Sequence, residues 1–514
     1  MTGSFKDELA RVLRAAGLPL PAECDPDRDG EHGSGAAARD GSGAAAWAGS
    51  ALDWAESGLM WLTGQPGQPP VVPAAPVLGR ARAAGRLLLA VSTRLGTPVA
   101  VDVAELLGGR AALLGLRRGG TVSANGSCRL LRTADGWVAV NLPREDDVDA
   151  VPALLGAMPA DILATAPLER GPGGAAGPAG RTGSDPLAEA WAALTIALPG
   201  RRGRDLVELA WLLGLPLAAL PAAPPAAPPA PVRISGGTPA EPGLPVSCPQ
   251  ASSRPPSEPP APGGRVPLVV DLSSLWAGPL AAHLLGRMGM RVLKVESTHR
   301  PDGARRGDPD FFHWLHAGHD GCRLDFTDPA GRAALHRLVE RAEVVIEGSR
   351  PRALAQLGLD ADRWVAARPG RVWLSITGYG RQAAAAGPGA GPVAFGDDAA
   401  VAGGLVAWSG AVRGGGVPVF CGDAIADPLT GLYGALAVAL CRAGGRGALL
   451  DLAMRDVAAF VAHPGPAASS WSVTGSDRSG WTVHEAGRRT PVRPPRAPRA
   501  AGAPRRPHTR QPPP

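Results

Sequence analysis

The chain has 514 residues, a formal net charge of +6, 70 glycines and 55 prolines. Residues 488–514 hold eight arginines and no acidic residue, so the rest of the chain is slightly acidic, which argues against a nucleic-acid-binding protein. The six cysteines form no Cys-x-x-Cys pair, and no apolar run is long enough to span a membrane. We therefore expect a cytoplasmic protein without a zinc ribbon, a disulfide framework or a membrane partner.

Stretches rich in glycine and proline divide the chain into five parts. The first begins with MTGSFKDELARVLRAAG, which predicts an amphipathic helix. The expected parts are an N-terminal helix with a flexible segment (1–46), a first folded block (47–220), a Pro-rich linker (221–264), a second folded block (265–465) and a disordered Pro/Arg-rich tail (466–514).

The first block contains a predicted β-hairpin. The run SCRLLRTADGWVAVNL has two strand-like segments around the turn Ala134–Asp135–Gly136. Helical segments are expected to follow near 144–156 and 185–214. These elements predict a smaller α+β domain in the N-terminal half of the chain.

Strand and helix signals alternate in the second block. The apolar strand signals are VPLVVDLSS, RVLKVES, EVVIEGS and RVWLSITGYG. Helices are predicted with Pro279 as first residue, from Pro329 through Arg341, and near 360–368. This alternation predicts an α/β fold, a Rossmann-like parallel sheet layer covered by helices. No Gly-x-Gly-x-x-Gly follows the first strand, which argues against a dinucleotide site.

Two pairs of segments suggest an internal repeat. ESGLMWLTG (56–64) is similar to AGGLVAWSG (402–410), and GTPVAVDVAELL (96–107) parallels GRGALLDLAMRD (445–456). Because the order and spacing agree, we interpret the chain as partly duplicated.

Histidines and arginines after the second strand offer two candidate sites. His299, His313, His316 and His319 include an H-x2-H-x2-H spacing, but no carboxylate completes a ligand set, so no metal is predicted. Arg300, Arg305 and Arg306 follow a strand end, where ligands bind in parallel sheets, and arginine there suits a phosphate. A solvated charged loop is the alternative for the arginines.

Asp427 is the most informative carboxylate. In IADPLTGLYGALAVAL it is predicted to be a helix N-cap, with Pro428 as first helical residue. Small neighbours such as Gly422 and Gly431 leave room for a bulky substrate. An ionised aspartate held in this way can be a covalent nucleophile toward a thioester.

The second block resembles the class III CoA-transferases of the CaiB/BaiF type. The opening VVDLSSLWAGPLAAHLLGRMGMRVLKVE, the later SITGYG and the segment around Asp427 are similar to family motifs, over about 266–463. The first block is similar to later parts of the same family, namely the stretch before the catalytic aspartate and the small domain with its T-A-D-G-W hairpin. The resemblance thus implies a partial copy at 47–220 and a Rossmann-like CoA-transferase domain at 265–465.

The resemblance implies a reaction and a set of binding residues. Asp427 would attack an acyl-CoA to form an anhydride, the thiolate would return to give an aspartyl-CoA thioester, and an acceptor carboxylic acid would take the CoA. No cofactor is expected, since CoA enters as the substrate thioester. Oxyanion donors would be Gly422 or glycines at 403–404 or 414–416. The implied CoA contacts are Trp276, Ala277, Ser297, Arg300, Gly348, Ser349, Arg350, Thr377, Gly378 and Tyr379.

Departures from the family pattern keep two alternatives open. Gly348–Ser349 replaces the family's Asn–Phe, which favours a catalytically weak CoA-binding paralogue. An acyl-CoA racemase shares the fold, but Phe395 or Gly396 stands where its histidine would be. In the first copy Leu78 or a neighbour replaces Asp427, so this copy should be inactive. We expect a homodimer or an intrachain pseudo-dimer, with the hairpin domain near Asp427.

Overall fold

A seven-stranded sheet forms the centre of the computed structural model. Its strands lie in the order β4-β12-β9-β8-β5-β6-β7; β4 is antiparallel and the others are parallel, which confirms the α/β prediction. The strands are β4 (Arg233–Ile234), β5 (Leu268–Asp271), β6 (Arg291–Ser297), β7 (Asp320–Leu324), β8 (Val344–Glu347), β9 (Val372–Thr377) and β12 (Ala448–Ala453). The structure describes residues 5–15, 17–18, 50–156, 185–234, 236, 266–349, 351–385, 392–410, 416–465 and 470–498.

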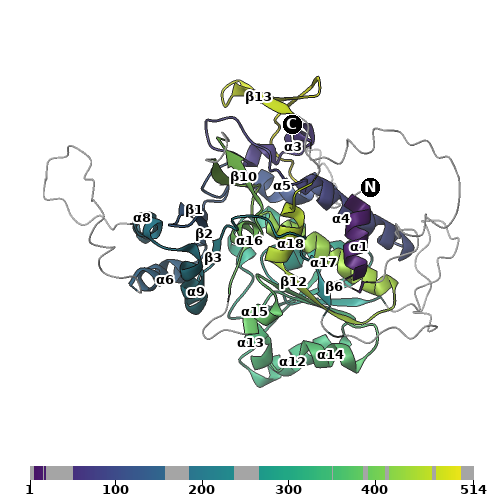
Figure 1. Ribbon diagram of the computed structural model, residues 1–514. Coiled ribbons are helices and arrows are strands. Elements are labelled where there is room, and N and C mark those ends of the chain that lie inside the picture. The colour runs from purple at the N-terminus through teal and green to yellow at the C-terminus, as the bar shows by residue number, and fades with distance from the viewer. Residues whose placement is uncertain are drawn as a thin grey trace, which may run out of the picture.

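Helices cover both faces of this sheet. α10 (Ala277–Arg287) and α17 (Ala426–Ala443) pack on one face, and α12 (Pro329–Arg341) and α14 (Ala361–Ala367) on the other (Figure 1). The central strands are therefore buried on both sides, which explains their continuous apolar sequences. Ile346 of β8 faces α10 and α17, whereas its neighbour Val345 faces the opposite core.

The predicted helix starts follow local sequence signals except at α10 and α17. α12 begins as predicted, since Pro329 is its first residue and the Asp328 carboxylate accepts from the Gly331 N–H at 2.9 Å. α10 begins at Ala277, two residues before the predicted Pro279. Leu275 adopts a φ of 70° and turns the chain into the helix early, and Pro279 still lies in the first turn, where its missing N–H has no consequence.

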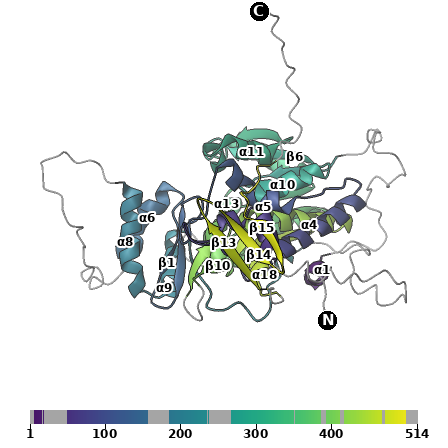
Figure 2. The ribbon, with the colours of Figure 1, turned by 90° about the horizontal axis from the view of Figure 1, so that it is seen from above.

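The predicted smaller domain lies beside the main body (Figures 1 and 2). The hairpin is confirmed: β1 and β2 pair antiparallel, and β3 extends the sheet. The helix expected over 185–214 is two helices, because Pro199 and Gly200 interrupt it. The elements are β1 (Cys128–Arg132), β2 (Trp137–Asn141), α6 (Glu145–Gly156), α8 (Pro186–Ala197), α9 (Gly203–Leu213) and β3 (Leu217–Ala219).

The remaining helices of the first block pack onto the second block. α4 (Val77–Arg94) lies against α17, and α1 (Phe5–Ala15), the predicted N-terminal helix, packs on α4. Residues 59, 60 and 62 and all of 432–440 are buried, as predicted for docked blocks. The other first-block elements are α3 (Ala51–Glu56), η3 (Met60–Leu62) and α5 (Val103–Leu113).

The structure bears on the proposed repeat in two ways. α4 and α17 each have 18 residues, and Leu78 and Asp427 both stand second in their helices. However, residues 56–64 end a helix and form η3, whereas 402–410 end α16 (Gly396–Ala402) and form strand β10 (Val406–Ser409). The two helices therefore match in length and in the place of these residues, whereas the segments before them differ in structure, and the repeat stays a prediction.

The prediction of a disordered tail over 466–514 is wrong for residues 470–498. They form a three-stranded sheet, β13 (Trp471–Ser476), β14 (Gly480–Glu485) and β15 (Arg488–Pro491), which packs on α3 (Figure 1). Trp481, Val483 and Glu485 alternate inward along β14, a short strand signal within a polar composition. Glu485 also accepts hydrogen bonds from Ser50 Oγ (2.6 Å) and the Leu52 N–H (3.3 Å).

A C-terminal strap, residues 492–498, continues from β15 across α5. A Cβ added at Gly108 would lie 2.9 Å from Pro495, and one at Gly109 would lie 2.8 Å from Pro498 and 3.1 Å from Trp314. Glycine is therefore needed on α5 for the strap to approach. The strap joins the end of the chain to the first block.

The predicted linker (221–264) is anchored part-way along its length. Val232 is fully buried and β4 pairs with β12, so the chain is anchored to the sheet edge before its proline-rich part ends. Residues 237–265 lie outside the described residues. None of the described helices is long and apolar enough to cross a membrane. The other elements are η5 (Gly303–Arg306), α11 (Pro309–His316), α13 (Pro351–Gln356), α15 (Arg381–Ala385), β11 (Val417–Phe420) and α18 (Met454–Ala462).

Candidate functional site

Asp427 lies in the first turn of α17, at the carboxyl edge of the parallel sheet. The prediction that Asp427 is the helix N-cap is wrong, because Ile425 holds that position. The Asp427 N–H donates to the Ala424 carbonyl at 2.9 Å. Ala424 has a φ of 41° and turns the chain so that the helix begins two residues earlier than predicted. The Asp427 side chain remains partly accessible to solvent.

Two aspartates of α16 face Asp427 and are held by the first block. Asn125 Nδ2 donates to Asp397 Oδ2, and Asn141 Nδ2 donates to Asp398 Oδ1, each at 2.9 Å. The second Asp397 oxygen accepts from the Ala424 N–H at 2.9 Å. The hairpin domain therefore lies near Asp427 within the same chain, as predicted.

Arg110 of α5 supplies the cation of the site. Its guanidinium donates to both carboxylate oxygens of Asp423, at 2.8 and 2.9 Å. It also lies 5.5 Å from the ring centre of Trp276 and 5.6 Å from that of Phe311. Arg110 thus connects the loop before Asp427 with the start of α10.

Four carboxylates lie close together here and are called the acidic cluster: Asp397, Asp398, Asp423 and Asp427. Burial raises the pKa of Asp427 to about 7, Arg110 opposes this rise, and Asp397 and Asp398 add to it. Burial likewise raises the pKa of Asp397 to about 6 and that of Asp398 to about 7. Because an aspartate reacts as the carboxylate, a reaction at Asp427 should become faster as the pH rises through 7.

Gly396 at the start of α16 presses against the reactive carboxyl group. A methyl group there would overlap Asp427 Oδ2 and the Ala424 carbonyl oxygen. We expect Gly396→Ala to turn the carboxylate and to slow any reaction of Asp427 by about 100-fold, since displacements of about 1 Å have such effects. The measurement is the rate of Asp427 modification by an acyl-CoA. The control is Gly156→Ala, where an added Cβ meets nothing within 4 Å; equal rates for the two variants would contradict the prediction.

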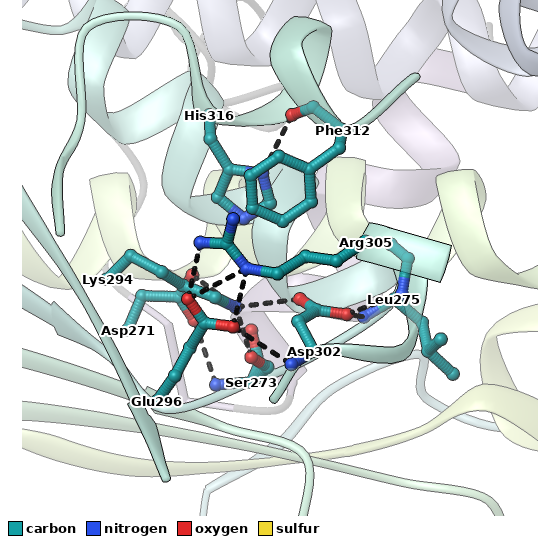
Figure 3. Close-up of polar contacts among 10 residues, drawn as sticks. Asp271, Ser273, Leu275, Lys294, Glu296, Asp302, Arg305, Phe312 and His316 are labelled. Carbon is teal, nitrogen blue, oxygen red and sulfur yellow. Dashed lines mark hydrogen bonds and ion pairs between the residues drawn. The ribbon is translucent and has the colours of Figure 1, made fainter. Parts of the chain in front are cut away.

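A buried ion network lies at the ends of β5 and β6 (Figure 3). Lys294 Nζ lies 3.0 Å from Asp302 Oδ2 and 3.4 Å from Asp271 Oδ2. Beside it, Arg305 binds Glu296, with Nε–Oε1 at 2.8 Å and Nη2–Oε2 at 2.6 Å, and covers the ring of Phe312 at 4.2 Å (Figure 3). Burial disfavours the Glu296 carboxylate, but the hydrogen bonds from Arg305 and the Asp302 N–H and the charges of Arg305 and Lys294 together outweigh burial and lower its pKa to about 2.

This pairing corrects the phosphate interpretation of Arg305, whose guanidinium is already bound to Glu296. The sequence could not reveal the pair, because residues 296 and 305 meet only when the intervening loop folds back. Arg300 and Arg306 are exposed and form no ion pair with the described residues. They remain the cations available at this edge.

The implied CoA contacts lie on four adjacent loops at the carboxyl edge. Trp276 and Ala277 begin α10, Ser297 ends β6, Thr377 ends β9, and Gly348 and Ser349 follow β8. Arg350 lies outside the described residues. The sheet order therefore brings these positions to one edge, near Asp427.

Tyr379 and Gly378 are enclosed by neighbouring elements. Tyr379 is buried, its ring centre lies 5.2 Å from that of Trp211, and Arg455 lies over its other side at 5.7 Å. A Cβ at Gly378 would lie 2.7 Å from that of Ala394. The small domain thus covers the Tyr379 ring.

Three of the glycines predicted as oxyanion donors, Gly422, Gly403 and Gly404, already have partners. The Gly422 N–H donates to Thr63 Oγ1 at 3.3 Å. The N–H groups of Gly403 and Gly404 donate to carbonyls at the end of α16, at 3.0 and 2.9 Å. These three assignments are therefore wrong for this arrangement, and residues 414–415 lie outside the described part.

The histidines are dispersed over several contacts. His299 pairs with Asp325 at 3.2 Å, and the ring centres of His316 and His319 lie 5.7 Å apart. Within the described ranges, no group of three potential ligands is arranged to hold a metal ion.

Sequence reasoning missed Arg110, Asn125, Asn141 and the role of Asp423. Arg110, Asn125 and Asn141 belong to the first block, so their proximity to Asp427 depends on how the two blocks dock. The available signal was a charged residue within an otherwise apolar helix, VAELLGGRAAL. That signal identifies a buried cation and not its partner.

The fold and site together define an α/β protein with an acidic cluster at the carboxyl edge of a parallel sheet. Residues 267–493 match the sequence model of CoA-transferase family III. The resemblance to CaiB/BaiF proteins is thereby confirmed. The match reaches through β13–β15, which agrees with their ordered packing.

Named relatives are similar over part of their length. The chain is 34% identical to the succinate–glutarate CoA-transferase of Agrobacterium fabrum over 225 residues, 40% of this chain and 53% of that protein. It is 33% identical to the succinyl-CoA–L-malate CoA-transferase beta subunit of Chloroflexus aurantiacus over 200 residues, 37% and 48% of the two chains. A solved CaiB/BaiF family protein from Brucella suis is 31% identical, covers 38% of this chain and 53% of its own, and has a TM-score of 0.33. The chain spans about half the length of these relatives.

Proposed function

We propose that the protein transfers CoA from an acyl-CoA to a carboxylic acid, with Asp427 as the covalent nucleophile. One observation carries the proposal: Asp427 is partly accessible, stands at the carboxyl edge of the sheet, and has a pKa of about 7, so an ionised form is present at neutral pH. The named CoA-transferases among the relatives support the reaction class.

The chemistry proceeds by exchange at three carbonyl carbons, those of the donor acyl group, of Asp427 and of the acceptor. An Asp427 oxygen attacks the thioester carbonyl, the C–S bond breaks, and an aspartyl–acyl anhydride and CoA thiolate form. The thiolate attacks the aspartyl carbonyl, which releases the donor acid and leaves an aspartyl-CoA thioester. The acceptor carboxylate then attacks the aspartyl carbonyl of this thioester, the C–S bond breaks, and an aspartyl–acceptor anhydride and CoA thiolate form. The thiolate attacks the acceptor's carbonyl, which gives the product acyl-CoA and releases the Asp427 carboxylate.

Two features of the chain would support these steps. Arg110 lies beside Asp423 and offers positive charge near the reacting carbonyls. The first block supplies Arg110, Asn125 and Asn141 in cis, which favours the intrachain pseudo-dimer over a site shared between subunits. CoA would bind along the loops that begin α10 and follow β6, β8 and β9, including Arg350.

The test is mass spectrometry of the protein after incubation with a panel of acyl-CoAs. We expect a mass increase on the peptide that contains Asp427 and, after a carboxylic acid is added, a new acyl-CoA. Absence of any adduct across the panel, in protein that binds CoA, would reject the transferase and leave the CoA-binding paralogue. The pairing of Arg305 with Glu296 is the observation that favours this alternative.

Exposed arginines should contribute to CoA binding unequally. We expect Arg300→Ala and Arg306→Ala each to weaken CoA binding by about tenfold, because a phosphate would lose a charged hydrogen bond. Arg305→Ala should instead lower the melting temperature, since Glu296 loses its partner. Calorimetry with CoA measures the binding. Arg363→Ala on α14, across the sheet, is the matched control; an equal loss there would contradict the assignment.

A further inference from the structure

We propose that Arg110 and Asp423 are a pair of positioning residues whose opposite charges together set the ionisation of Asp427. Arg110 favours the Asp427 carboxylate, and Asp423 limits this effect by neutralising Arg110. This inference rests on the proposed function in one respect, namely that the carboxyl group whose ionisation it concerns is the proposed nucleophile, Asp427.

The geometry fixes the pair close to Asp427. The Asp423 side chain is fully buried, that of Arg110 is 21% exposed, and two hydrogen bonds join them. Gly422 and Ala424, on either side of Asp423, have φ values of 77° and 41°, so the loop before α17 has a defined, unusual path. Trp276 and Phe311 lie along the guanidinium and hold it in place.

Few other charges face Asp427. Asp397 and Asp398 do so from α16, and Arg110 does so from α5. Elsewhere on the helices packed against α17, Arg80 of α4 donates to the carbonyls of Val461 and His463, and Arg287 of α10 donates to that of Ala100.

The charged side chains of α18 and β12 have partners away from the site. Asp456 of α18 pairs with Arg233 and Arg455, and Asp451 of β12 accepts from the Arg381 N–H. His283 of α10 is buried beside His319, and burial lowers its pKa to about 4, so it is neutral at pH 7. Among the described residues Arg110 is therefore the cation that acts on Asp427 itself, whereas Arg144 acts on Asp398.

The proposal predicts that substitutions of Arg110 and of Asp423 shift the pKa of Asp427 in opposite directions. Arg110→Gln keeps a hydrogen-bond donor toward Asp423 but removes the positive charge, so the pKa of Asp427 should rise. Asp423→Asn keeps an acceptor for Arg110 but removes the negative charge, so the pKa of Asp427 should fall. A role limited to loop packing would weaken the site in both variants without moving the two titrations in opposite directions.

The size of the effect can be measured at neutral pH. If the pKa of Asp427 rises from about 7 to about 8 in Arg110→Gln, its ionised fraction at pH 7 falls from about one half to about one tenth. The rate of adduct formation should then fall about fivefold at pH 7 and recover at pH 9. In Asp423→Asn the rate should rise less than twofold at pH 7 but several-fold at pH 6.

The experiment uses the full chain with ¹³C-labelled aspartate side chains. The Asp427 carboxyl signal is assigned by its loss in Asp427→Asn, and its chemical shift is followed with pH in the wild type and both variants. Opposite displacements of the titration support the proposal; displacements of the same sign, or none, overturn it. If Arg110→Gln fails to fold, Asp423→Asn decides alone, since a lowered pKa supports the pair and an unchanged or raised one rejects it.

This measurement is independent of catalysis. A titration that moves as expected in a protein that forms no acyl adduct would reject the proposed transferase and keep the electrostatic pair. Adduct formation with unmoved titrations would keep the transferase and reject the pair.

Discussion

Asp427→Asn should abolish CoA exchange while leaving the fold intact. Loss of a covalent nucleophile lowers turnover by about 10⁴-fold or more. The melting temperature should stay the same or rise, because burial raises the pKa of Asp427 and an amide avoids the cost of a buried carboxylate. Turnover is measured by following acyl-CoA formation, and folding by calorimetry.

A second aspartate provides the matched control. Asp360 caps α14 on the far face of the sheet and accepts from the Arg363 N–H at 3.0 Å. Asparagine caps helices comparably, so Asp360→Asn should keep full activity. Appreciable turnover in well-folded Asp427→Asn would show that another group carries the reaction.

Deletion of residues 466–514 should unfold the protein or leave it insoluble. It removes the inward side chains Trp481, Val483 and Val492, each of which stabilises by about 1.5–3 kcal/mol when buried. It also removes Glu485, the partner of Ser50 at the start of α3. The sum is comparable with the whole stability of a domain. Thermal unfolding of the truncated protein measures this effect.

Deletion of 499–514 is the control for that experiment. It keeps β13–β15 and the C-terminal strap, so the melting temperature should not change. If the longer deletion unfolds at the wild-type temperature, the terminal sheet contributes nothing to stability.

Local signals made the parallel sheet and the helix that carries Asp427 predictable. The strands β5, β6, β8 and β9 are buried on both faces, so their apolar runs are continuous and readily recognised. Asp427 stands in a distinctive segment that opens a long apolar helix. β7, with its mostly exposed side chains, gave no such signal and was not predicted.

Contacts between distant segments set the limit of prediction. The partner of Arg305 depends on how η5 folds back, and that of Arg110 depends on how the two blocks dock. The terminal sheet was missed because arginine and proline dominate the average composition, whereas three inward residues of one strand decide the packing. Average composition indicates how well a segment is solvated, whereas the alternation of apolar and polar side chains along a strand determines whether one face of that strand can be buried.

The docking of the two blocks has a consequence for biosynthesis. Arg110 and Asp423 are separated by 313 residues, so at about 5–20 residues per second the ribosome needs roughly 15–60 s to supply the partner of α5. During that interval the apolar surfaces of η3 and α4 have no α17 to cover them. The nascent first block is therefore expected to be a strong client for chaperones that bind exposed hydrophobic segments, and synonymous codons that slow translation between the blocks should lower the soluble yield without changing the protein.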